Sequence, residues 1–199
     1  MKRFFAFLFG FAVLGVSLSC KEKTTKPMPA SEAVKTPVVN KVLIDTTLLS
    51  EENISESLYE KMNNISELKN FQQALKGTEL QEQMQYKKGP FTIFALSNNV
   101  FGFEMVDSLR TQSINDSVVE ELARQIIEEK ITSIDLIRRL KKVKGALVLY
   151  SLSKENMNIL RSDFDIFIST AKLKRARLGK TDIEASNGII HIVDSVWNK

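Results

Sequence analysis

The sequence of 199 residues contains a single cysteine, Cys20, and a single histidine, His191. One cysteine excludes an internal disulfide bond, because a disulfide joins two thiols. One cysteine and one histidine are also too few for a cysteine–histidine zinc site, and the acidic residues form no cluster at metal-ligand spacing. We therefore expect no metal and no cofactor.

Phosphate-binding loops are missing as well. The chain contains neither GxGxxG nor GxxxxGK[ST], the glycine-rich patterns that bind nucleotide phosphates.

The formal net charge of +4 includes Lys2 and Arg3, which lie in a segment that we expect to be removed on export. Without these two residues the charge falls to +2. Such a small excess of basic residues is weak evidence for nucleic acid, so we expect no nucleic-acid partner.

The N-terminus has the pattern of an export signal. Lys2 and Arg3 precede a run of 13 uncharged residues, 4–16. This run is too short for an ordinary membrane span, which needs about 20 residues, but it suits the core of a signal peptide. Ser17 and Ser19 then lead to Cys20. We predict a signal peptide over residues 1–19.

The segment before Cys20 resembles a bacterial lipoprotein signal, which implies that Cys20 carries the lipid. Lipoprotein signals usually have Leu three residues before the cysteine, whereas here Ser17 takes that place and Leu18 follows it. Small residues at Ser17 and Ser19 also suit ordinary signal peptidase, which would leave Cys20 as a free thiol. Both routes predict an exported protein.

Residues 20–45 are predicted to be a flexible tether. The stretch after Cys20 is polar and contains Pro27, Pro29 and Pro37, so it cannot bury enough apolar surface to fold alone. Lys21 stands where lipoproteins of the inner membrane often have Asp. We therefore expect an outer-membrane lipoprotein that faces the periplasm or the cell surface.

The remaining chain, residues 46–199, is predicted to form one α+β domain. Capping boxes predict helices that begin at Asn64 and Ser117, the second with an apolar stripe of Leu122, Ile126 and Ile127. A third short helix is predicted from Thr132, with Ile134, Ile137 and Leu140. Apolar runs predict strands over residues 91–96, 146–150, 164–168 and 189–197, with a turn at Asn187-Gly188. Helices thus come early and strands late. Both faces of 189–197 are mostly apolar, which predicts a central, covered strand.

Two motifs carry a resemblance to a known family. Residues 91–101, FTIFALSNNVF, resemble the first fasciclin motif, FTVFAPTNxAF. Residues 182–196, DIEASNGIIHIVDSV, resemble the closing motif, DIxASNGVIHVIDxV, at nearly every position. The resemblance covers residues from about 50 to 199. Arg124 and Gln125 stand where the family usually has a Tyr-His pair, which in animal relatives is linked to integrin binding.

The resemblance implies a fasciclin-like wedge in which β-sandwich-like strands pack beside several N-terminal helices. It also implies a non-enzymatic adhesion or interaction module that binds protein or glycan partners in the cell envelope. A structural envelope component without a dedicated ligand is the alternative. The motif residues expected to have structural roles are Phe94, Asn98, Phe101, Asn187, Gly188, His191 and Asp194.

Asp182 and Ile183 are the candidate partner contacts, because an Asp-Ile pair before the closing motif is an adhesive determinant in some animal fasciclin domains. The simpler interpretation is that Ile183 fills the core while Asp182 caps a turn.

His191 lies between Ile190 and Ile192. A lone histidine within an apolar strand is more often a hydrogen-bonded core residue than a catalytic base, which would need a nucleophile and an orienting carboxylate nearby.

The first testable prediction concerns the anchor. If Cys20 is lipidated, the mature protein should partition into detergent, and Cys20→Ala should release it from membranes or block its processing. Mass spectrometry of the mature N-terminus provides the measurement. An unmodified Cys20 at that terminus would contradict the lipid anchor.

Overall fold

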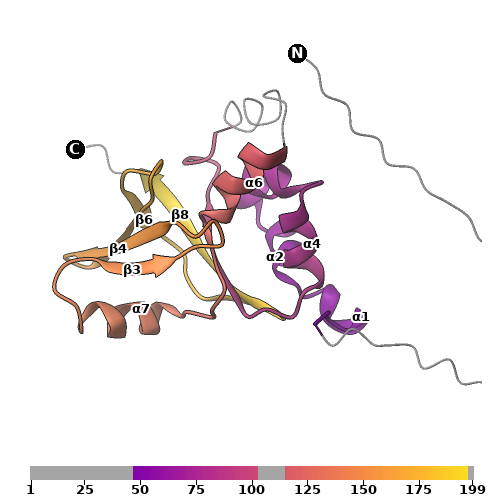
Figure 1. Cartoon of the computed structure of the whole chain (residues 1–199), viewed down its shortest axis with the longest axis horizontal. Helices are drawn as coiled ribbons and strands as arrows, with labels where there is room; N and C mark the ends of the chain where they lie inside the picture. The colour runs from indigo at the N-terminus through magenta and orange to yellow at the C-terminus, as the bar shows by residue number, and fades with distance from the viewer. Residues whose placement is uncertain (1–46, 103–114, 197–199) are drawn as a thin grey trace, which may run out of the picture. The chain divides into compact units, whose positions relative to one another are not determined.

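The structure is a computed structural model that describes residues 47–102 and 115–196. Most helices come before most strands along the chain (Figure 1). The helical elements are α1 (Glu51–Ile54), α2 (Leu58–Asn63), the 3-10 helix η1 (Ser66–Leu68), α3 (Lys69–Leu75), α4 (Glu79–Tyr86), α6 (Asn115–Ala123) and α7 (Ser133–Leu140). The strands are β1 (Phe91–Leu96), β2 (Ile126–Ile127), β3 (Leu147–Tyr150), β4 (Asn156–Ser162), β5 (Asp165–Ser169), β6 (Ala176–Leu178), β7 (Ile183–Ala185) and β8 (Gly188–Val196).

The strands form one sheet in the order β2-β1-β8-β6-β5-β4-β3, and β7 also pairs with β8. β1 and β8 run parallel, whereas the other pairs are antiparallel. The two ends of the sheet approach each other, because the amide of Leu152, just after β3, donates to the carbonyl of Ile126 in β2 at 2.8 Å. The α+β class is confirmed.

The predicted covered strand is present as β8. All residues from Gly188 to Val193 are buried, and so is every residue of its parallel neighbour β1. Figure 1 shows α2, α4 and α6 together beside the β1–β8 pair, and α7 beneath β3 and β4. Leu58, Phe71 and Met84 of the helices are fully buried in the same apolar cluster as Ile93 and Ile190. None of the described helices is long and apolar enough to cross a bilayer.

The third predicted helix begins with a capping box at Thr132. Thr132 accepts a hydrogen bond from the amide of Asp135, whose carboxylate accepts from the amide of Thr132, so α7 begins as its sequence predicts. The box at Asn64 is wrong. Asn64 instead follows the last residue of α2 as its C-cap, and its side-chain amide donates to the carbonyl of Glu60. Only two residues separate α2 from η1, so Asn64 belongs to the end of one helix rather than to the start of the next.

The helix predicted to begin near Ser117 begins at Asn115, but it does not continue through Ile126. Ile126 and Ile127 form β2 and pair with Ile93 and Thr92 of β1. Two adjacent β-branched residues suit a strand at least as well as a helix, and pairing with the buried β1 decides between them. The helical stripe predicted across this segment is therefore wrong beyond Ala123.

The covered strand generates a second prediction. Ile190→Asp should unfold the domain, because an unpaired buried charge costs several kcal/mol, comparable to a total stability of about 5–15 kcal/mol. Thermal unfolding followed by circular dichroism measures the effect. Ser195→Asp, at the exposed end of the same strand, is the control and should melt close to the wild type. An unchanged melting temperature for Ile190→Asp would contradict the buried register.

Candidate functional site

His191 lies in the middle of β8 and is fully buried. Its Nδ1 lies 3.2 Å from the backbone nitrogen of Asp182, and its Nε2 lies 2.7 Å from the carbonyl oxygen of Ile131. A backbone N–H can only donate, so Nδ1 accepts, and Nε2 carries the proton that it donates to Ile131. Burial lowers the pKa of His191, and the hydrogen bond to Ile131 and the charge of Asp182 oppose this only in part. The imidazole is therefore neutral at neutral pH.

Asp182 continues this network to the start of α7. Its backbone has a φ of 60°, in the left-handed region that Asp tolerates better than most residues. Its carboxylate accepts from the backbone nitrogen of Ser133 at 2.8 Å and also from the Ser133 hydroxyl. The loop before β7 is thus fastened to the first residue of α7 and, through His191, to β8.

Ser133, Asp182 and His191 are the residue types of a hydrolase triad, but their connections differ from those of a triad. In a triad the histidine bonds the serine hydroxyl on one side and the carboxylate on the other. Here the serine bonds the carboxylate directly, and both imidazole nitrogens bind backbone groups. Because His191 is also shielded from solvent, this arrangement provides neither an activated serine nor an accessible base.

Asn187 connects elements that are far apart in the sequence. Its Oδ1 accepts from the amide of Leu58 at 2.9 Å, which lies at the start of α2. Its Nδ2 donates to the carbonyls of Met84 and Lys87 at 2.9 and 2.8 Å, at the end of α4. Its own carbonyl accepts from the amide of Phe91, the first residue of β1. The side chain thus fixes the start of α2 and the end of α4 against the central strands.

Gly188 lies directly after Asn187, where β1 and β8 begin to pair. A Cβ atom at Gly188 would overlap the carbonyl oxygen of Phe91 and crowd the Leu58 side chain. Only glycine therefore allows Phe91 and Leu58 to approach this closely. The Asn-Gly pair of the closing motif has two different tasks, since Asn187 supplies hydrogen bonds and Gly188 supplies space.

The first motif is held in a similar way. Asn98 accepts from the amide of Asn70 at 3.0 Å and donates to the carbonyl of Ser66 at 2.9 Å, which joins the turn after β1 to η1 and α3. Phe94 lies 5.3 Å from the His191 ring, centroid to centroid. Phe101 packs edge-on against Phe71 at 5.9 Å. These contacts place the first motif against the core.

Asp194 pairs with Arg177 of β6. Its two carboxylate oxygens accept from Nε and Nη2 of Arg177 at 3.2 and 2.7 Å. The hydroxyl of Ser195 also donates to it at 2.9 Å. Asp194 therefore links β8 to β6 near the point where their pairing is irregular.

Asp182 and Ile183, the candidate partner contacts, are both half-buried. Ile183 pairs with Ile190 of β8 and packs against the apolar core. The neighbouring Glu184 is exposed and lies 2.5 Å from the ammonium group of Lys130. The surface next to this pair is therefore charged and accessible, while the pair itself is partly engaged in the fold.

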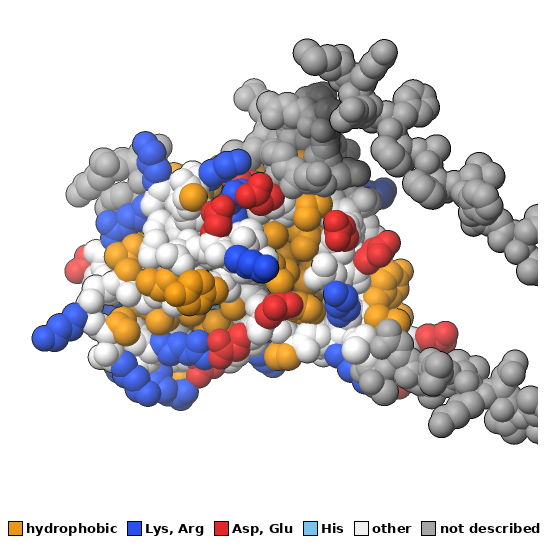
Figure 2. Space-filling model, viewed as in Figure 1, with side chains coloured by type: hydrophobic (Ala, Val, Ile, Leu, Met, Phe, Trp, Pro, Cys, Tyr) orange, Lys and Arg blue, Asp and Glu red, His pale blue; other side chains and the backbone are white. Residues whose placement is uncertain are grey.

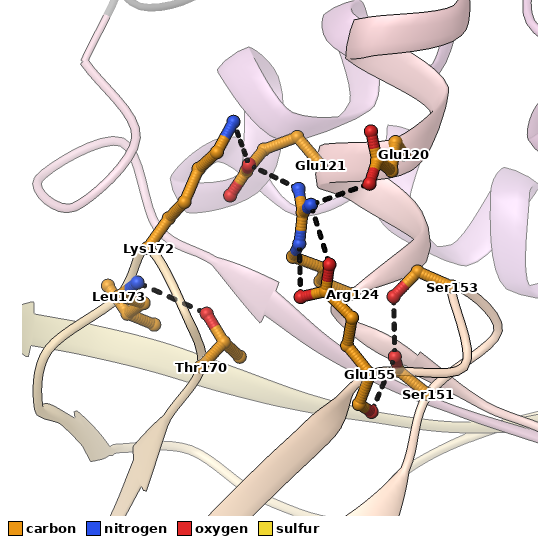
Figure 3. A network of polar contacts seen from close by, with 9 residues as sticks. All are labelled: Glu120, Glu121, Arg124, Ser151, Ser153, Glu155, Thr170, Lys172 and Leu173. Atoms are coloured by element: carbon orange, nitrogen blue, oxygen red, sulfur yellow. Dashed lines mark hydrogen bonds and ion pairs between the residues drawn. The ribbon is translucent and has the colours of Figure 1, made fainter.

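Arg124 is the centre of a charged network that the sequence did not predict (Figure 3). Its side chain is 6% exposed and contacts the carboxylates of Glu120 and Glu121 at 2.8 Å each. It also binds Glu155 with two hydrogen bonds, of 2.7 and 2.9 Å, and Lys172 contacts Glu121 at 3.2 Å. The hydrogen bonds from Arg124 lower the pKa of Glu155.

This network joins α6 to the turn between β3 and β4. Arg124 and Gln125 stand where the family usually has Tyr and His, and both are buried. Gln125 uses its backbone carbonyl to bind the amide of Phe94. Arg124 is thus part of the connection between helices and sheet. No local pattern indicated this role, because Glu155 is 31 residues away in sequence.

The predicted anchor, Cys20, and the whole predicted tether lie outside the described residues. Within residues 47–102 and 115–196, no three His, Cys, Asp or Glu side chains are grouped so that they could hold a metal ion.

Comparison with known proteins agrees with the motifs. The sequence matches the fasciclin domain family over residues 66–198. It is 30% identical over 126 residues to the protein sll1483 of Synechocystis sp. (strain ATCC 27184 / PCC 6803 / Kazusa), and the match spans 62% of each chain.

A solved structure of a FAS1 domain pair from the insect cell adhesion molecule fasciclin I has the same fold. It matches 72% of this chain and 51% of its own, with a TM-score of 0.56 and 17% identity. The described strands and helices, the two motifs and the family match agree, and the chain belongs to the fasciclin domain family.

Proposed function

We propose that this chain is a non-enzymatic interaction module of the cell envelope, which binds a protein or glycan partner. The observation that carries the proposal is that the reactive groups in the closing motif are engaged in structural hydrogen bonds. His191 binds two backbone groups, and Asp182 binds Ser133. Groups that are occupied in this way stabilise a binding surface rather than perform chemistry.

The family supports the same proposal, because fasciclin domains are commonly associated with adhesion, and the insect neighbour is described as a cell adhesion molecule. The N-terminal sequence supports a place in the envelope. A signal segment, Cys20 and a polar, proline-containing stretch follow one another before the domain. Such an order suits a lipoprotein of the outer membrane that faces the periplasm or the cell surface.

We place the partner surface at the loop that carries Asp182 and Ile183. The amide of Gly179 donates to the carbonyl of Ile192, and the amide of Ile192 donates to the carbonyl of Lys180. Together with the Asp182–Ser133 contacts, these bonds hold the loop in one conformation. A loop that is already ordered loses little conformational entropy when it binds a partner, which favours affinity.

The third prediction tests this surface. Residues 21–199 should capture a partner from envelope extracts, and Ile183→Ala should weaken the capture. Ile166→Ala in β5 is a matched control, because Ile166 is also a half-buried isoleucine packed against the core. Both variants should lose similar stability, whereas only the first should lose capture. Equal capture by the two variants would contradict the assigned surface, and no capture by the wild type would favour a structural envelope component.

The fourth prediction concerns His191. Since His191→Gln removes hydrogen bonds of a buried network, the melting temperature and partner capture should fall together. If His191 were catalytic, the variant would fold normally and lose an activity of the wild type by about a hundredfold or more. Mutant melting curves and capture assays on the same preparations separate these outcomes.

The pH dependence of stability gives a second measurement on the same variant. Because the pKa of His191 is lowered in the folded protein, its unfolded form binds a proton first as the pH falls through about 6.5. The neutral histidine therefore contributes its full stability above that pH, and the contribution declines below it. Denaturant unfolding should show this loss in the wild type and not in His191→Gln. Parallel pH profiles for the two proteins would contradict a buried neutral histidine.

A further inference from the structure

The outward face of α7 carries apolar side chains where a solvated helix would carry polar ones. The core contacts of α7 come from Leu136 and Leu140, which are buried. The predicted helix with Ile134, Ile137 and Leu140 is present, but Ile134 is 64% and Ile137 is 37% exposed. Ile134, Arg138 and Lys141 follow one another at helical spacing on the outward side. This face thus combines isoleucine with basic residues.

The loop after α7 extends this surface. Residues 141–145 are all exposed, and they include Lys141, Lys142 and Lys144. Arg138 and Arg139 are paired with Asp135 and Glu129, but none of the three lysines has an ion-pair partner among the described residues. The sequence contains no acidic residue from 136 to 154. The loop therefore carries three positive charges close together, with no acidic residue in the surrounding sequence to balance them.

An exposed aromatic side chain lies at the same end of the sheet as this loop. Phe164 is 97% exposed at the tip of the hairpin that joins β4 to β5. Leu147 of β3 pairs with Ile159 of β4, and the two strands are antiparallel. The chain just before Leu147 therefore runs beside the end of β4 that leads to Phe164. The hairpin tip and the lysine loop lie at the same end of the sheet.

Exposed apolar side chains are concentrated in this region. Of nine large apolar side chains that are clearly exposed in the described residues, six lie between 134 and 164: Ile134, Ile137, Val143, Val148, Tyr150 and Phe164. Figure 2 shows Lys and Arg side chains gathered at the lower left, where α7 lies in Figure 1, next to apolar side chains. We call α7, residues 141–145 and the hairpin tip the basic-apolar surface.

We infer that the basic-apolar surface docks on an anionic lipid bilayer. Lys141, Lys142 and Lys144, which have no ion-pair partner in the part of the chain that the structure describes, match the negative charge of lipid headgroups, and their aliphatic stems can lie along the apolar region beneath. Ile134 and Phe164 are 64% and 97% exposed, so their side chains are available to enter the boundary between headgroups and acyl chains, as apolar residues of interfacial helices do. A single-stranded nucleic acid would instead need aromatic platforms for its bases, whereas most of the exposed apolar side chains of α7 and its loop are aliphatic.

This inference goes beyond the proposed function and does not depend on a lipid at Cys20. If Cys20 is lipidated, the anchor would hold the surface at high local concentration near a bilayer, where even weak docking is favoured. The closing experiment therefore uses unlipidated residues 21–199. This segment keeps the folded unit Leu43–Lys199, which contains the whole described core.

Co-sedimentation with vesicles tests the docking. The unlipidated protein should bind vesicles of phosphatidylglycerol and phosphatidylcholine but not vesicles of phosphatidylcholine alone. The triple variant Lys141→Gln, Lys142→Gln, Lys144→Gln should lose about a hundredfold in partition coefficient, because each basic residue at an anionic surface contributes about fivefold. The matched control is Lys69→Gln, Lys76→Gln, Lys88→Gln, which changes the charge equally at exposed lysines of the helical half.

A second variant tests the apolar part of the surface. Ile134→Ser with Phe164→Ser should also weaken vesicle binding, and it should leave the melting temperature close to that of the wild type, since both side chains are mostly exposed. Three outcomes would overturn the inference. The first is wild-type binding that does not require phosphatidylglycerol, and the second is an equal loss of binding in the two lysine variants. The third is full binding by the serine variant, which would make the surface a general polyanion site.

Discussion

The parallel pairing of β1 with β8 is the constraint on which the other features depend. Both strands are buried along their whole paired length, so water cannot satisfy polar groups there. Each polar side chain in the pair consequently has a protein partner. Thr92, for example, donates to the carbonyl of Glu129 at 2.5 Å and accepts from the amide of Ile131 at 2.8 Å.

The same constraint explains why the family motifs contain structural residues rather than a catalytic site. Asn187, His191 and Asn98 each bind backbone groups of another element, and these bonds fasten loops and helix ends around the central strands. A buried polar group that lost its partner would cost about 1–3 kcal/mol. A motif of this kind can therefore stay similar between proteins that bind different partners.

Binding properties are then expected on surfaces that the core does not restrict. The loop with Asp182 and Ile183 is held firmly but is partly exposed, and the basic-apolar surface has side chains that contribute nothing visible to the core. Substitutions at the exposed side chains of the basic-apolar surface are expected to change stability by less than about 0.5 kcal/mol. This freedom allows surface chemistry to differ from one family member to another while the β1–β8 pair is kept.

The sequence by itself determined the family, the α+β class and the strand at 91–96, because motifs and apolar runs are local patterns. It also predicted a strand over 189–197, which the structure has as β8 (Gly188–Val196), and a helix that begins at Thr132. It did not reveal β4, whose sequence is rich in polar residues, or β7, which has only three residues. Only the tertiary structure joined His191 to Ile131, Asp182 to Ser133 and Arg124 to Glu155. Packing also decided that α7 buries Leu136 and exposes Ile134, since partners distant in sequence meet only after the chain has folded.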